Sequence, residues 1–152
     1  MSETTDRSVI EITAEQTHDL RRRVLRVGTP SAEVEWPGDR LATTTHLGVV
    51  GDTGVVAIAT WLVSPSPDLD SGLAGLQLRG MATDPAVRGT GVGAMLLSAG
   101  IERARRAGVD HVWANARSSV LDFYTRHGFD ITSDEFESAE TAIAHRRILL
   151  RF

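Results

Sequence analysis

The stretch "MATDPAVRGTGVGAMLL" (residues 81–97) combines three glycines, an arginine and an apolar run with helical spacing. Gly89, Gly91 and Gly93 lead directly into the apolar run, and Arg88 stands just before them. Free N–H groups and the positive end of a helix attract anions, and glycine lets a phosphate come close to the backbone. The stretch therefore predicts a phosphate-binding loop at the start of a helix.

Two nucleotide-binding motifs compete for this loop. The P-loop needs a lysine, and the sequence has none. The dinucleotide fingerprint is formally matched from Gly89 to Ala94, with Asp110 about 20 residues further on. In that fingerprint the acidic residue ends the next strand, whereas Asp110 begins a predicted one. The segment 84–88 also separates the preceding strand from the glycines, so the context disfavours a nicotinamide cofactor.

Composition and length narrow the classes of protein. The chain has 152 residues, which predicts one domain, and a net charge of −4, which gives no electrostatic case for nucleic acid. It has no cysteine, which excludes disulfides, thiolate catalysis and cysteine-bound zinc. The run "VVAIATWLV" (55–63) is too short to cross a bilayer, and the polar N-terminus has no signal-peptide pattern. A cytoplasmic location with no membrane partner is the expectation.

Hydrophobic patterns and turn residues predict an alternation of strands and helices. Thr13 is the expected N-cap of the first helix, Ser119 and Asp122 form a capping-box pattern, and glycines favour a bulge in the fourth strand. Strands are predicted at 8–12, 41–50, 55–63, 73–83, 109–116, 129–138 and 143–152, and helices at 14–26, 90–107 and 119–127. The order β-α-β-β-β-α-β-α-β-β indicates an α+β fold with a mixed sheet.

Two motifs together resemble the GNAT superfamily of N-acetyltransferases. The acyl-CoA signature R/Q-x-x-G-x-G/A of that superfamily is met by Arg88, Gly91 and Gly93. A second signature, Y-x-x-x-G-F, follows one strand later and is met by Tyr124, Gly128 and Phe129. The resemblance covers nearly the whole chain and is strongest to a less-characterised bacterial branch. It implies one N-acetyltransferase domain over residues 1–152, with a mixed, mostly antiparallel central sheet and helices on both faces.

The resemblance also implies a site for acetyl-CoA between the strands at 76–83 and 109–115. The pantetheine arm is expected along the backbone of Met81, Ala82 and Thr83. Asn115 and Tyr124 are further expected cofactor contacts, although the position where the superfamily often has asparagine is occupied here by Arg117. The pyrophosphate is expected on the N–H groups of Arg88, Gly89, Thr90, Gly91, Val92, Gly93 and Ala94.

Catalysis by this site needs an acid and a base. Tyr124 is the candidate general acid, because a phenol with a pKa near ~10 can protonate a departing thiolate; the alternative is a plain core aromatic. The base is open between Glu137, His145 and His46, since "QLRG" (77–80) has no carboxylate or imidazole. The acceptor site is expected to include His46, Gln77, Arg79 and Phe136, and Trp36 and Trp61 are weighed either as acceptor contacts or as packing residues.

The expected function is transfer of an acetyl group from acetyl-CoA to a primary amine of a small molecule or protein, by direct attack in a ternary complex. The alternative is an inactive coenzyme A-binding protein of the same fold that acts as a sensor or structural partner. Acidic residues at 130–140 either attract a cationic amine or form a solvated hairpin tip. Dimers are frequent in the superfamily, so the resemblance admits a homodimer, and no metal site is expected.

Overall fold

The computed structural model describes residues 8–70 and 72–152, and within them eight strands form one sheet. The strand order is β1-β2-β3-β4-β5-β8-β6, and β7 also pairs with β8. Only β4 and β5 run parallel; the other pairs are antiparallel. The strands are β1 (Val9–Ile12), β2 (Thr45–Gly51), β3 (Gly54–Val63), β4 (Gly75–Thr83), β5 (His111–Arg117), β6 (Asp130–Ile131), β7 (Phe136–Glu137) and β8 (Ala144–Arg151).

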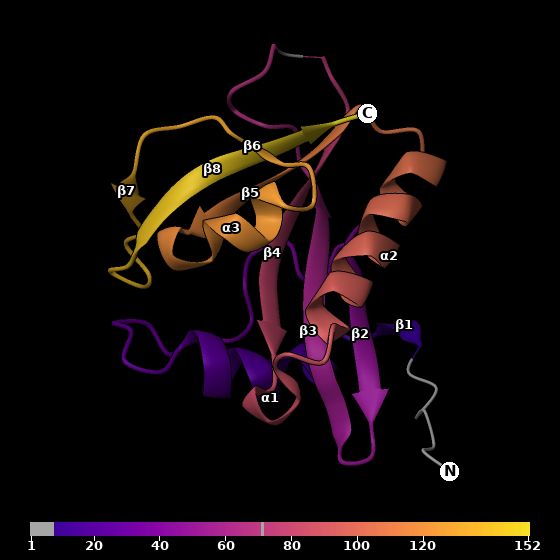
Figure 1. Cartoon of the computed structure of the whole chain (residues 1–152), viewed down its shortest axis with the longest axis vertical. Coiled ribbons are helices and arrows are strands. Elements are labelled where there is room, and N and C mark those ends of the chain that lie inside the picture. Colours follow the sequence, from indigo (N-terminus) through magenta and orange to yellow (C-terminus); the bar gives the residue numbers. More distant parts are fainter. Residues whose placement is uncertain (1–7, 71) are drawn as a thin grey trace.

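Helices cover both faces of this sheet. Helix α2 (Val92–Arg106) and the short α3 (Leu121–Thr125) lie on one face (Figure 1), where they pack on the larger core. The N-terminal helical segment packs on the opposite face, where Leu20 meets Ile58 and Ala82 in a second, smaller core. This arrangement confirms the α+β class, the mostly antiparallel mixed sheet and the helices on both faces.

The N-terminal helical segment changes its hydrogen-bond pattern along its length. It begins as the 3₁₀ turn η1 (Glu15–Thr17), continues as α1 (His18–Leu20) and ends as the π-helical turn η2 (Arg21–Leu25). Thr13 caps it as predicted: its Oγ1 accepts from the N–H of Gln16 at 3.2 Å, and the Gln16 amide oxygen accepts from the N–H of Thr13 at 2.8 Å. π-turns often mark functional sites, and here the turn carries Arg21 toward the sheet.

Three boundary predictions are wrong. Residues 41–44 form a turn before β2 rather than its first part, and no side chain caps the turn η4 (Ser118–Val120), so the Ser119 capping box does not form. The strand predicted at 129–138 is divided into β6 and β7. It divides because the Ser133 hydroxyl, not a backbone carbonyl, accepts from the N–H of Arg147 at 2.8 Å. The side chain thus replaces a ladder bond, and the backbone leaves the sheet.

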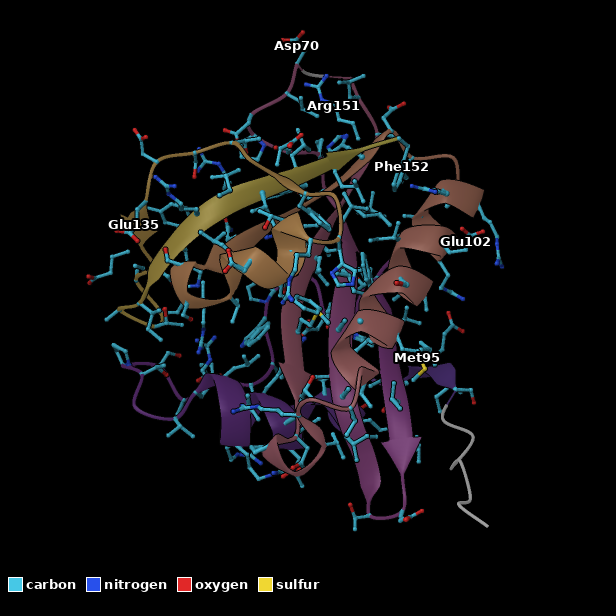
Figure 2. All side chains as sticks on the ribbon, viewed as in Figure 1. Asp70, Met95, Glu102, Glu135, Arg151 and Phe152 are labelled. Carbon is cyan, nitrogen blue, oxygen red and sulfur yellow. The ribbon has the colours of Figure 1, made fainter. Side chains whose placement is uncertain are left out.

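The contact between α2 and β3 depends on a missing side chain. Gly100 lies on α2 over Trp61 of β3, which is buried in the larger core. A Cβ at Gly100 would lie 1.8 Å from Cζ2 of the Trp61 indole. Glu102, two residues on, points away from the sheet (Figure 2) and pairs with Arg106 at the surface. Among residues 8–70 and 72–152, no helix has both the length and the apolar character that crossing a membrane would require.

We expect Gly100→Ala to lower the free energy of unfolding by at least ~2 kcal/mol, because overpacking forces the helix away from the sheet. The matched control is Gly93→Ala on the same helix, where the nearest atom to an added Cβ is Thr83 Oγ1 at an ordinary 3.6 Å. Denaturant unfolding of both variants measures the difference. Equal stability of the two variants would contradict the close packing at Gly100.

Candidate active site

The glycine-rich loop presents several free backbone N–H groups, but not all of the seven expected ones. Those of Arg88 and Thr90 donate to the carbonyls of Pro85 and Val87 at 3.4 and 3.3 Å. The turn η3 (Pro85–Val87) follows β4 and is capped by Asp84, whose carboxylate accepts from the N–H of Ala86. Gly89 and Gly91 then adopt positive φ angles of 81° and 83°, and a Cβ at either would meet nothing within 4 Å. Glycine is therefore required here by backbone conformation, and the surface above the loop stays open. Because a helix leaves its first N–H groups without internal partners, the start of α2 offers several donors there.

A bulge at Gly80 opens the sheet beside this loop. Ile58 of β3 pairs with Ala82 of β4, and the next pair is Thr60 with Arg79. Between these two pairs β3 advances by two residues and β4 by three. The extra residue is Gly80, with φ +62°, which confirms the predicted bulge. A Cβ there would lie 2.7 Å from the Trp36 ring, so the position needs glycine for both space and conformation.

Beyond the bulge, β4 loses its parallel neighbour. β4 and β5 pair only as far as Leu78 and Ala114, so the two strands part at their carboxyl ends. The N–H of Asp84 donates to Val56 of β3 at 2.8 Å, and N–H directions alternate along a strand. The N–H groups of Met81 and Thr83 therefore point into the opening, and that of Ala82 points to β3. An extended ligand can pair with this free edge.

A cavity of about 580 Å³ occupies the opening between β4 and β5. It reaches from the face of α3, at Tyr124, to the opposite face, at Trp36 and Arg26. Of the predicted residues, this cavity brings together Gln77, Arg79, Met81, Asn115, Tyr124 and His145, with Trp36. Its lining residues do not include the other predicted ones, which are His46, Ala82, Thr83, the loop residues 88–94, Phe136 and Glu137.

Tyr124 forms part of the cavity wall on α3. It is buried, and its hydroxyl contacts the Met81 sulfur at 3.7 Å, a weak acceptor. Burial raises the pKa of Tyr124 to about 12. The phenol thus keeps its proton throughout the neutral range, and its O–H group has no strong partner among the described residues.

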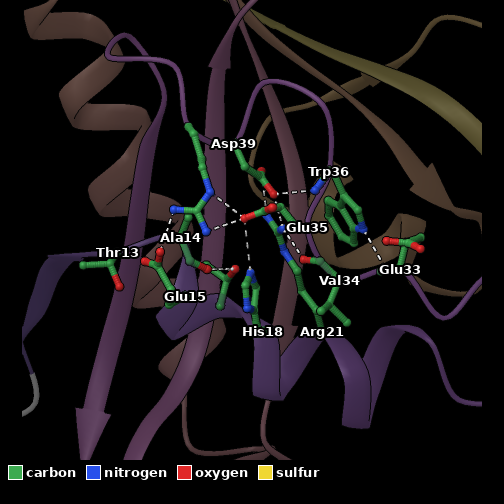
Figure 3. Close-up of polar contacts among 12 residues, drawn as sticks. Thr13, Ala14, Glu15, His18, Arg21, Glu33, Val34, Glu35, Trp36 and Asp39 are labelled. Carbon is green, nitrogen blue, oxygen red and sulfur yellow. Dashed lines mark hydrogen bonds and ion pairs between the residues drawn. The ribbon is translucent and has the colours of Figure 1, made fainter.

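A buried ion pair lies behind the Trp36 and Arg79 side of the cavity wall (Figure 3). Arg21 donates to both Asp39 oxygens at 2.6 and 3.2 Å, and both side chains are fully buried. Burial acts to raise the pKa of Asp39, but the Arg21 guanidinium and the Trp36 N–H outweigh it and hold that pKa below its usual value. The Trp36 ring lies 3.7 Å from the Arg21 guanidinium carbon.

Two predicted acceptor residues belong to this network. Arg79 lines the cavity but also donates to Asp39 Oδ1 at 3.0 Å and to the Pro37 carbonyl. His46 is buried between Thr60 Oγ1 and the Asp39 carbonyl, each at 2.8 Å, and so supports Asp39 rather than lining the cavity. Trp61 is a core residue and does not line the cavity.

His145 and Glu137 differ in their access to the cavity. His145 on β8 lines it, and its Nδ1 lies 2.7 Å from the Ile143 carbonyl. A carbonyl only accepts, so Nδ1 carries the proton and the neutral ring keeps a lone pair on Nε2. Phe136 stacks on the His145 ring at 6.0 Å and steadies it from outside the cavity. Glu137 is exposed on β7.

Several cavity residues were not expected from the sequence. Arg26 ends the helix predicted at 14–26, Glu33 comes from the segment that joins this helix to β2, and Glu140 comes from the loop before β8. No motif includes these residues, so no local signal marks them as part of a site. Arg117, which stands where the superfamily often has asparagine, also lines the cavity.

The model of the Acetyltransferase (GNAT) family matches residues 15–129 of this chain. The chain belongs to the GNAT family. A Bacillus subtilis relative, the uncharacterized N-acetyltransferase YitI, is 30% identical over 126 residues, which cover 83% of this chain and 84% of YitI. The family match at residues 15–129 spans both motifs and the strands β2 to β5. Membership of the family supports acyl transfer as the general activity.

Solved structures share the fold of this GNAT protein. Escherichia coli ElaA aligns with a TM-score of 0.78 at 19% identity, over 95% of this chain and 99% of ElaA. An aminoglycoside 6'-N-acetyltransferase complexed with coenzyme A aligns with a TM-score of 0.71 at 12% identity, over 95% and 96% of the two chains. At these identities the likeness shows the fold alone.

Tyr124 is the only tyrosine of the chain, so phenolate absorbance reports this residue directly. We expect its midpoint near 12 in the folded protein and near ~10 in unfolded chains. Because burial raises the pKa of Tyr124 in the folded state, its ionisation costs more free energy in the folded protein than in the unfolded chain. Its contribution to the free energy of unfolding is therefore complete below pH ~10 and is lost between pH ~10 and ~12. Absorbance after a rapid pH jump, with denatured protein as control, measures both values. A folded-state midpoint near that of the denatured control would contradict the burial of Tyr124.

Proposed function

We propose that this protein transfers an acetyl group from acetyl-CoA to a primary amine by direct attack within a ternary complex. The observation that carries the proposal is the parting of β4 and β5. It places an unpaired strand edge and a buried phenol on one cavity, and the open glycine loop directly follows that edge in the chain. The acetyl group as donor is supported by the names of the matching family and of YitI.

The residues present fit coenzyme A. The open surface over Gly89 and Gly91 leaves room for a pyrophosphate against the N–H groups at the start of α2, and exposed Arg88 adds a positive charge. The N–H groups of Met81 and Thr83 suit an extended, amide-containing arm. When bound, acetyl-CoA supplies an electrophilic thioester carbonyl and a thiolate leaving group.

The chain's own groups would then act on protons and charge. The N–H of Met81 points into the opening, where it can donate to a carbonyl oxygen as negative charge develops. Tyr124 holds its proton at Oη on the cavity wall and can give it to sulfur. His145 Nε2 has a free lone pair on the same cavity and is the best-placed base to deprotonate the acceptor ammonium, directly or through water, before the resulting amine attacks. Glu137 remains a weaker candidate, because it does not line the cavity.

We expect Arg88→Ala to weaken coenzyme A binding about tenfold, because one charge-assisted hydrogen bond at an exposed site is lost. Arg106→Ala is the matched control, since this exposed arginine lies at the far end of α2 and pairs only with Glu102. Isothermal calorimetry with coenzyme A measures both affinities, and thermal unfolding checks that both variants fold. An unchanged affinity of Arg88→Ala for coenzyme A would contradict the assignment of Arg88 to phosphate binding.

We expect Tyr124→Phe to lower kcat by roughly 10²-fold with little change in coenzyme A affinity, at the low end for general acids because a thiolate leaves readily. His145→Gln should also lower kcat, whereas Glu137→Gln should not. The assay is thiol release with a panel of amines. Coenzyme A binding with no acetylation of any amine, and no effect of Tyr124→Phe, would favour an inactive coenzyme A-binding protein instead.

A further inference from the structure

Two arginines face the cavity on the side away from Tyr124. Arg26 ends the N-terminal helical segment, and Arg117 ends β5, so they come from different layers of the fold. Their guanidinium groups contact backbone carbonyls: Arg26 Nε donates to Glu33 at 2.9 Å, and Arg117 Nη2 donates to Leu25 at 2.8 Å. Their other N–H groups have no protein acceptor within residues 8–70 and 72–152.

Neither guanidinium is neutralised by a carboxylate. In the described part of the chain, no Asp or Glu oxygen lies within 4.0 Å of Arg26 or Arg117, whereas Arg21 and Arg79 share Asp39. Burial lowers the pKa of both arginines, and the charge of Arg117 further lowers that of Arg26 against an opposing effect of Glu140. Two like charges are thus held near each other, half-buried, at a cost that a bound anion would relieve.

Three carboxylates also line the cavity. They are all exposed and lie more than 4.0 Å from the two guanidiniums, and one of them, Glu35, pairs with Arg40; the other two are Glu33 and Glu140. Water screens them more than it screens the half-buried arginines. The cavity therefore offers a half-buried positive pair and more exposed negative charge beside it, which matches a ligand that carries both an anionic group and an ammonium.

We propose that the acceptor is a small amine that also carries a carboxylate or phosphonate group, and that Arg26 and Arg117 bind this anionic group. The inference rests on the proposed acetyl transfer. An arginine presents its N–H groups in a fork that fits the oxygens of carboxylates and phosphonates. Leu25, Trp36 and Val120 add apolar surface to the same cavity, so an amino acid with an apolar side chain suits it.

The test compares acceptors that differ in one group. Glycine, leucine, phenylalanine and glutamate are assayed with acetyl-CoA beside their carboxamides and their aminophosphonate analogues. We expect kcat/KM to favour at least one anionic form over its carboxamide by about tenfold or more. The anionic form with the larger kcat/KM, carboxylate or phosphonate, identifies which anion the site fits. No preference for an anionic form anywhere in the panel would overturn the proposal.

Variants separate recognition from folding. The double variant Arg26→Gln/Arg117→Gln should lose most of that preference through a higher KM for the anionic acceptor, so that its kcat/KM values for the anionic form and the carboxamide converge. Arg22→Gln is the matched control, because Arg22 is exposed on the same helical turn and does not line the cavity. A double variant that keeps the full preference would overturn the assignment of these two arginines.

A binding arm keeps this test independent of catalysis. Calorimetry with coenzyme A present compares the N-acetylated amino acids with N-acetylated carboxamides, and it needs no turnover. Tighter binding of the anionic forms, lost in Arg26→Gln/Arg117→Gln, supports the anion site even if no acceptor is acetylated, and in that case the proposed function alone fails. Equal binding of the two forms would count against the anion site whatever the activity.

Discussion

The separation of β4 from β5 after Leu78 is the constraint on which the site depends. Two parallel strands that stayed paired would satisfy each other's N–H groups and leave no edge for a ligand. The bulge at Gly80 inserts one residue, increases the local bend and shifts the N–H of Met81 toward the gap. Gly80 also makes room for the Trp36 ring, so one glycine shapes both the strand edge and the cavity wall.

The buried Arg21–Asp39 pair supports the other side of that gap. The segment between η2 and β2 has no regular structure of its own, yet it supplies Glu33 and Trp36 to the cavity. Asp39 anchors this segment by accepting from Arg21, Arg79 and the Trp36 N–H. A buried ion pair adds little net stability, but loss of one partner leaves a buried charge at a cost of about 3–5 kcal/mol. The pair therefore mainly fixes where the segment lies.

The parts of the fold that the sequence predicts are those encoded by contiguous residues. Helix α2, its glycine loop and the bulge in β4 follow from local spacing and from conformations that favour glycine. The division of 129–138 is not local, because it depends on Ser133 accepting a bond from Arg147 on β8. The 3₁₀-to-π progression of the first helix is not local either, since Arg21 is drawn to Asp39 on a later segment.

The same distinction runs through the candidate site. Tyr124 and the glycine loop could be found by motif, and His145 only as one of several bases. The choice among these bases depends on the three-dimensional structure, in which His145 on β8 lines the cavity and Glu137 lies outside it. Arg26 gives no sequence signal, because its position follows from how the N-terminal segment packs against β4.

Under the proposed function, the two ligands would be recognised by different means. The cofactor would meet backbone N–H groups within residues 81–94, which do not depend on side-chain identity as long as the glycine conformations persist. The acceptor would meet cavity side chains from four separate segments, which include Arg26, Arg117, Glu140 and His145. A fold built in this way can keep one donor while its acceptor is set by a few arginines and carboxylates.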